Sequence, residues 1–154
     1  MLGLRLRFRT IASELRVLNF NAKDLTEKRL LKVAKQVYPE RVDRALLMRS
    51  DLTDNITLWE ILGIDAVILL ENQKGELIRV GVSLMDKEKT ARNHLFSMKK
   101  QEGCLLREAL GIQQYWVFLV QWKNFPKTKE EWVDILYGEI DREPPFSGCR
   151  LIIL

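Results

Sequence analysis

Few side chains in this sequence can act as nucleophiles or as ligands for a soft metal. The chain of 154 residues contains two cysteines, Cys104 and Cys149, and one histidine, His94. A structural zinc site takes four Cys or His ligands, and the cysteines do not form a C-x-x-C pair, so such a site is disfavoured. Serine- or cysteine-hydrolase chemistry would have only His94 as its base, without an accompanying G-x-S-x-G motif. We expect His94 to lie on the surface of a helix.

Lysine and arginine are concentrated in the first third of the chain. Residues 1–50 contain 12 Lys/Arg and 5 Asp/Glu, whereas residues 51–100 contain 7 and 8, and residues 101–154 contain 6 and 8. A basic segment beside a nearly neutral body suits a polyanion such as nucleic acid. A solvated basic face without a partner explains the same counts.

The segment 2–9, LGLRLRFR, alternates between apolar residues and the arginines Arg5, Arg7 and Arg9. This period of two predicts a strand, although the pattern also fits a start that continues into a helix through residues 10–20. On a strand the three guanidinium groups would stand about 7 Å apart, which suits contacts with phosphates. An edge strand whose charges discourage aggregation is the other interpretation.

Capping signals and apolar spacing predict the helices that position these groups. The predicted helices span residues 24–38, 39–50, 86–111 and 128–138. The third helix either runs without interruption to Gly111 or breaks near Gly103. Asp24 with Glu27, and Thr128 with Glu131, have the capping-box spacing at the start of two of them. Gly138 has the position of a C-terminal stop for the last helix.

Five segments predict strands: residues 55–61, 65–71, 77–85, 114–120 and 149–154. Segment 55–61 also fits a helical turn, and Gly75 supplies the tight turn between the second and third segments. Short turns favour an antiparallel meander of the first three strands, and a helical crossover favours a parallel fourth strand. We therefore expect an α/β fold with a mixed sheet. The chain is expected to be one domain, with a basic N-terminal prelude at 1–50 and a core at 51–154.

This order of elements resembles the restriction-endonuclease-like core of the PD-(D/E)XK superfamily, over about residues 40 to 121. Residues 63–69, GIDAVIL, look like the second strand of that core, with Asp65 in the place of its acid. The resemblance implies that Asp65 binds Mg²⁺ and that Glu60 is an auxiliary carboxylate, since Mg²⁺ prefers oxygen ligands. In an active member, the metal would activate water for phosphodiester cleavage.

The third strand departs from the acid-x-lysine pattern of that family. With Val80 as the leading apolar residue, Gly81 and Ser83 replace the acid and the lysine; with Ile78 leading, Arg79 and Gly81 replace them. Lys87, just beyond the strand, is the candidate for a migrated catalytic lysine. We expect a degenerate core that does not cleave, with no cofactor; an active endonuclease with Mg²⁺ is the alternative.

Nucleic acid is the expected partner of this core. Its candidate phosphate contacts are Arg5, Arg7, Arg9, Lys87, Arg92, Lys99 and Lys100. Trp122 follows a predicted strand end, where stacking on bases is possible. A different class of function is a protein-interaction or assembly subunit, in which a sheet edge and the apolar segment 151–154 bind a protein partner or form a homo-oligomer.

The sequence contains no apolar run long enough for a signal peptide or a membrane span. Two cysteines that are not paired by any motif fit a reducing compartment. We therefore expect a cytoplasmic protein that does not bind membranes.

Overall fold

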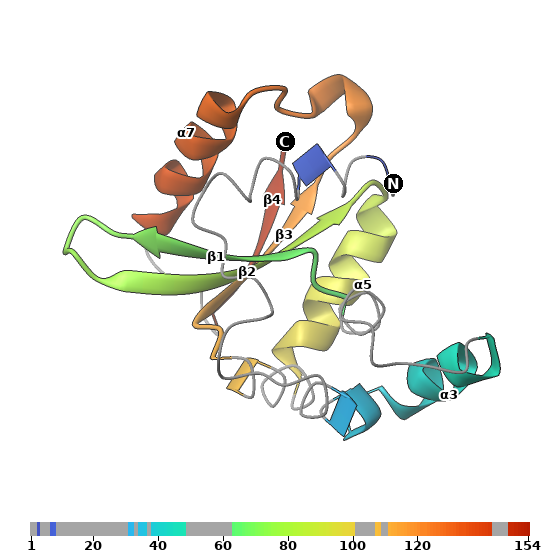
Figure 1. Cartoon of the computed structure of the whole chain (residues 1–154). Helices are drawn as coiled ribbons and strands as arrows, with labels where there is room; N and C mark the ends of the chain where they lie inside the picture. Colours follow the sequence, from blue (N-terminus) through green and yellow to red (C-terminus); the bar gives the residue numbers. More distant parts are fainter. Residues whose placement is uncertain are drawn as a thin grey trace.

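A computed structural model gives the arrangement of the elements (Figure 1). It describes residues 3, 7–8, 31–32, 34–36, 38–48, 63–100, 107–108, 111–142 and 148–154. The elements are α3 (Pro39–Met48), β1 (Ala66–Glu71), β2 (Leu77–Met85), α5 (Glu88–Lys99), β3 (Gln114–Leu119), the short 3₁₀ helix η1 (Trp122–Asn124), α7 (Lys129–Ile140) and β4 (Cys149–Ile153). Among the described helices, none is long and apolar enough to cross a membrane.

Four strands form one mixed sheet in the order β1-β2-β3-β4. β1 runs antiparallel to β2, β3 is parallel to β2, and β4 is parallel to β3. Helices connect the parallel strands, because a parallel connection must return along the sheet. The predicted α/β class and mixed sheet are confirmed. The strand predicted at 55–61, which would be the first of the three strands in the predicted meander, lies outside the described residues.

The hairpin of β1 and β2 has the predicted turn. Asn72 Oδ1 accepts a hydrogen bond from the backbone N–H of Glu76 at 2.9 Å. Gly75 has a φ of 78°, in the left-handed region that a residue without Cβ adopts readily. The turn sets the register of the hairpin, in which Ala66 pairs with Val82.

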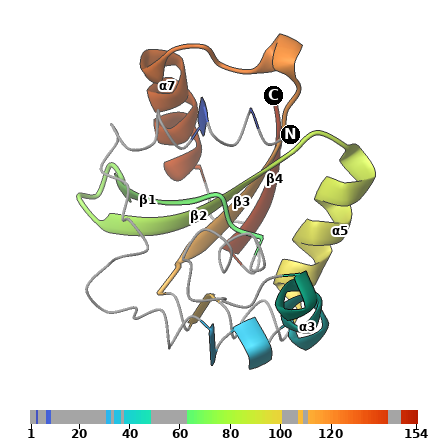
Figure 2. The ribbon, with the colours of Figure 1, turned by 45° about the vertical axis from the view of Figure 1, so that its right-hand side comes forward.

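Helices cover both faces of the sheet, as Figures 1 and 2 show for α5 and α7. Alternate residues of β3 belong to two separate cores. Tyr115 and Val117 pack with buried residues of α5, whereas Trp116 and Phe118 pack with Trp132 and other residues of α7. A sheet buried on both faces needs apolar residues at nearly every position, which explains the continuous apolar runs in its strands.

The first helical part of the crossover ends a few residues before the break predicted near Gly103. α5 ends at Lys99, and Lys100 has extended backbone with a ψ of 174°. Residues 107–108 are again helical, and Gly111 follows them with a φ of 67°. The predicted glycine end near residue 111 is therefore confirmed.

α7 begins as predicted and ends later. Thr128 Oγ1 accepts a hydrogen bond from the Glu131 backbone N–H at 3.2 Å, and Glu131 Oε2 accepts from the backbone N–H of Lys127 at 3.1 Å. The predicted stop at Gly138 is wrong, because the helix continues to Ile140. Ile140 is buried against the sheet, and this burial outweighs the cost of glycine in a helix, about 1 kcal/mol.

The strand predicted at 2–9 is wrong at the residues that are described there, since residues 3, 7 and 8 are helical. Phe8 is fully buried, and its ring lies edge-on to Trp132 with 4.7 Å between the centroids. Arg7 Nη2 donates to the carbonyl oxygen of Lys127 at 3.3 Å. At residues 7 and 8, packing of the Phe8 ring on α7 has therefore overridden the local period of two.

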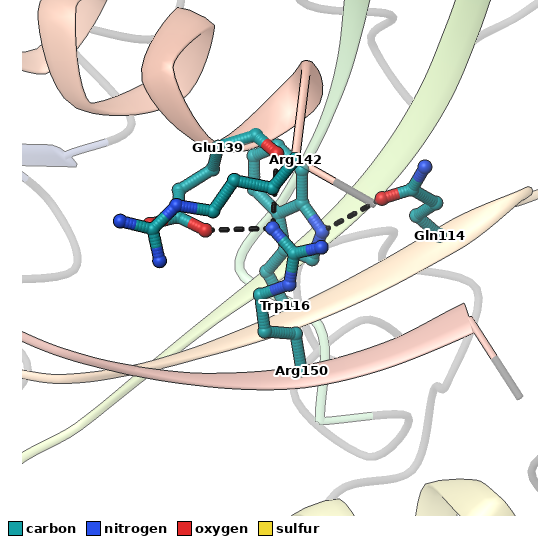
Figure 3. Close-up of polar contacts among 5 residues, drawn as sticks. All are labelled: Gln114, Trp116, Glu139, Arg142 and Arg150. Atoms are coloured by element: carbon teal, nitrogen blue, oxygen red, sulfur yellow. Dashed lines mark hydrogen bonds and ion pairs between the residues drawn. The ribbon is translucent and has the colours of Figure 1, made fainter. Parts of the chain in front are cut away.

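A buried ion pair joins β4 to α7 (Figure 3). Arg150 Nη1 donates to the carbonyl oxygen of Glu139 at 2.9 Å and to its Oε2 at 2.7 Å. Only 13% of the Arg150 side chain and 10% of the Glu139 side chain are exposed. Arg142 approaches the other carboxylate oxygen of Glu139 at 3.4 Å, but is 69% exposed. The sheet and α7 are therefore held together by a charged contact as well as by apolar packing.

Candidate functional site

Asp65 lies just before β1 and is buried. Ala66, the next residue, pairs with Val82 of the antiparallel strand β2. Continuing this register by one residue places Ser83 opposite Asp65. The Asp65 backbone N–H donates to the carbonyl oxygen of Val82 at 2.8 Å, and its Oδ2 accepts from the backbone N–H of Leu84 at 2.7 Å. The carboxylate thus extends the hydrogen-bonding ladder between the two strands.

Gly81 precedes Ser83 by two residues on β2 and pairs with Val67, and its missing side chain leaves room for two buried residues. A Cβ at position 81 would lie 2.9 Å from Cδ2 of Tyr115 and 3.0 Å from Cδ1 of Ile112. Real Cβ atoms do not approach carbon this closely. The space that a carboxylate at position 81 would need is therefore filled by the Tyr115 ring and Ile112.

A network of hydroxyl and imidazole groups occupies the same side of the sheet. Ser83 Oγ forms hydrogen bonds with the carbonyl oxygen of Gly63 and with the Tyr115 hydroxyl. The Tyr115 hydroxyl also donates to the carbonyl oxygen of Gly63 at 3.0 Å and lies 2.6 Å from His94 Nε2. His94 is half-buried rather than on the surface as predicted. A Cβ at Gly63 would lie 2.7 Å from His94 Cε1, so the histidine packs directly on this glycine.

The protonation of Tyr115 follows from its burial. Desolvation raises the pKa of Tyr115 well above its ordinary value, and the hydrogen bond from Ser83 lowers it by a smaller amount. The hydroxyl therefore keeps its proton at neutral pH. The Tyr115 hydroxyl has one proton, which it donates either to the carbonyl oxygen of Gly63 or to His94 Nε2, and the tautomer of His94 selects between the two. Tyr115 is a neutral donor here and cannot act as a general base.

This arrangement favours structure over catalysis. Ser83 and Tyr115 are completely buried, so neither hydroxyl can reach a substrate. Residues that are described include no group of three or more His, Cys, Asp or Glu side chains that could hold a metal ion. Sequence reasoning missed the roles of Ser83, Tyr115 and His94. The paired apolar strands around Ser83 and Tyr115 were the available signal, because buried hydroxyl groups must find partners.

Of the other residues predicted for a metal or catalytic site, the structure describes Lys87. Glu60 lies outside the described residues. Lys87 is exposed and occupies the N-cap position of α5, without a hydrogen bond from its side chain to the helix. Asp65 is thus the one predicted catalytic residue that the described structure places beside the network.

The predicted phosphate contacts fall into two groups. Arg5 and Arg9 lie outside the described residues, and Arg7 is exposed while bonded to Lys127. The remaining four belong to the exposed surface of α5 and its caps; they are Lys87, Arg92, Lys99 and Lys100. Arg92 Nη2 forms an exposed ion pair with Glu88 at 2.9 Å. Exposed cations of α5 and its caps therefore make up most of these predicted contacts.

Trp122, the predicted stacking residue, is 59% exposed. Its ring lies 6.2 Å from that of Phe125, between centroids. A nearby groove has equal numbers of acidic and basic side chains; it is lined by Lys123, Lys127, Glu131, Asp134 and apolar neighbours. The charges around this groove do not select an anion.

Comparisons of the chain with protein-family models, with curated proteins and with solved structures found no match.

Proposed function

We propose that this protein binds nucleic acid through the basic surface of α5, on a degenerate endonuclease-like core that does not cleave. The antiparallel hairpin, the crossover helix and the parallel strand that follows it support the resemblance to the PD-(D/E)XK architecture. The proximity of Ser83 to Asp65 favours the register in which Gly81 and Ser83 replace the acid and the lysine.

The contact between Gly81 and Tyr115 carries the proposal that the core does not cleave. A second carboxylate beside Asp65 would have to displace a completely buried ring whose hydroxyl is fixed by Ser83 and Gly63. Ser83 itself is a neutral hydroxyl and supplies no positive charge. A two-carboxylate magnesium site and a lysine are both missing from these positions, which argues against metal-activated water.

The charge of α5 and its caps supports nucleic acid as the partner. Between residues 87 and 100 the exposed charged side chains are Lys87, Glu88, Lys89, Arg92, Lys99 and Lys100. The five cations outnumber the one acid, and they lie on an element that packs rigidly on the sheet. Such a surface binds a phosphate backbone with an affinity that falls as salt rises.

The test combines binding with cleavage. Wild-type protein should bind a DNA duplex with an affinity that decreases steeply with salt, and plasmid DNA should stay intact with Mg²⁺ or Mn²⁺, for wild type and Asp65→Ala alike. A Lys99→Gln/Lys100→Gln variant should reduce the salt slope by about 2, and Lys129→Gln on α7 is the matched control. Absence of binding at low salt would refute the proposal. Cleavage by wild type that Asp65→Ala abolishes would establish the active alternative.

The edge of the sheet supports a second candidate, an assembly subunit. β4 is the last strand of the described sheet, and Ile153 in it is 62% exposed. An exposed apolar residue on an outer strand can pair with another chain. Light scattering of wild type and Ile153→Lys at low and high salt tests this candidate. Salt-insensitive self-association that the substitution removes supports it, and a monomer under all conditions eliminates it.

A further inference from the structure

A phenylalanine stands in the middle of the basic face of α5. Phe96 is 61% exposed, although its helix buries Ala91 and Met98 on the opposite side. Residues three, four and seven positions away share one side of a helix. Around Phe96 four of these positions are held by exposed cations, and Asn93 holds a fifth; the cations are Lys89, Arg92, Lys99 and Lys100.

The surroundings of Phe96 differ from those of Tyr137, the other exposed aromatic residue on a described α-helix. Lys100 Nζ lies 4.5 Å from the centroid of the Phe96 ring. Tyr137 of α7 is 42% exposed, and its neighbours three residues before and four residues after are the exposed acids Asp134 and Asp141. Of these two rings, the one on α5 is combined with a positive surface, which is complementary to an anion that also carries aromatic groups.

We infer that the Phe96 face of α5 binds single-stranded nucleic acid, with a base stacked on the ring and phosphates on the flanking cations; this inference rests on the proposed function. Stacking requires an accessible face of a base, which a duplex hides between neighbouring base pairs. The cations extend from Lys89 to Lys100, about 16 Å along the helix, so they can follow a strand on both sides of the stacked base.

The contact of Lys100 with the ring is compatible with this role. An exposed cation–π contact is weaker than the stacking of a base on an aromatic side chain. A base can therefore replace the amine on the ring, and the displaced amine remains close enough to pair with a phosphate. An anionic lipid surface fits less well, because insertion requires a wide apolar stripe and this face has a single apolar residue at its centre.

Fluorescence anisotropy with a labelled oligothymidylate of about 16 nucleotides, and with a duplex of the same length, tests the inference. Wild-type protein should bind the single strand more tightly than the duplex. Phe96→Ala should weaken single-strand binding about 5- to 100-fold and leave duplex binding nearly unchanged. Phe96→Tyr keeps the ring and should restore binding. Tyr137→Ala is the matched control and should have no effect. Circular dichroism verifies that each variant is folded.

The outcomes separate this inference from the proposed function. If single strand and duplex bind equally well and Phe96→Ala changes neither, the inference is overturned while the nucleic-acid proposal stands. If neither binds at low salt, the proposed function fails as well. If vesicles of an anionic phospholipid bind in a Phe96-dependent way and the oligonucleotides do not, the face is a membrane contact and both proposals are overturned.

Discussion

Replacing Gly81 with alanine adds one methyl group at the most crowded position of the candidate site. Its Cβ would lie 2.9 Å from the Tyr115 ring and 3.0 Å from Ile112. Tyr115 cannot turn away easily, because its ring is completely buried and its hydroxyl bonds to Ser83 and Gly63. The added methyl must therefore be accommodated by distortion of the core.

The expected change in the free energy of unfolding is the balance of two opposing contributions. Inserting a methyl group into a packed core costs about 1–3 kcal/mol. Removing a glycine lowers the entropy of the unfolded chain, which stabilises the folded state by about 0.4–1 kcal/mol. The difference between these contributions spans about 0–2.6 kcal/mol, and we expect Gly81→Ala to lower the free energy of unfolding by about 1–2 kcal/mol, near the middle of that range.

Gly138→Ala is the matched control, since a Cβ at position 138 meets nothing within 4 Å. In the interior of α7 this change should raise the free energy of unfolding by about 0.5–1 kcal/mol. Urea unfolding of both variants and wild type measures the two effects, which should have opposite signs. Unchanged or increased stability of Gly81→Ala would show that the Tyr115 ring does not fill this space.

Two further substitutions test the buried polar groups. Tyr115→Phe removes a hydroxyl that burial keeps neutral. Since the unfolded chain loses this proton above about pH 10 and the folded chain retains it, wild-type stability should fall there by up to about 1.4 kcal/mol per pH unit, and the variant should lack that component in urea unfolding at alkaline pH. Equal slopes for the two proteins would contradict the assignment. Arg150→Met leaves the Glu139 carboxylate buried without this partner and should destabilise by about 3 kcal/mol, whereas Arg142→Met should cost less than about 1 kcal/mol. Similar small effects in thermal unfolding would mean that water reaches Glu139.

The parts of the fold that depend on local signals could be predicted from the sequence. The second strand of the hairpin spans Leu77–Met85, as its apolar run and the turn at Gly75 indicate. The start of α7 follows from Thr128 and Glu131, which are close in sequence. Such signals involve residues within a few positions of each other, so tertiary structure changes them little.

Features that depend on distant contacts could not be predicted in this way. The helical conformation at Phe8 goes with its contact to Trp132, far along the chain. The hydrogen-bond network of Ser83, Tyr115 and His94 forms only when two conditions are met together. β2 and β3 must pair in the observed register, and α5 must place His94 beside Tyr115. Nothing in the spacing of Ser83, His94 and Tyr115 reveals that they meet. For the same reason, the sequence shows Gly81 only as the absence of an acidic residue, whereas the fold shows that this glycine leaves room for the Tyr115 ring.

The covering of the sheet on opposite faces has a topological consequence. β2, β3 and β4 follow one another in one direction, yet the chain crosses one face through α5 and the other through α7. The two crossovers therefore have opposite handedness, and one departs from the right-handed rule. The chain leaves the neighbouring strands β2 and β3 toward opposite faces, and in open α/β sheets ligands bind outside the carboxyl ends of the strands at such a switch point. Trp122 follows β3 at this end, and a Cβ at Gly3 would lie 3.1 Å from its ring. Part of the chain's own N-terminal segment thus stands where such sheets receive a ligand.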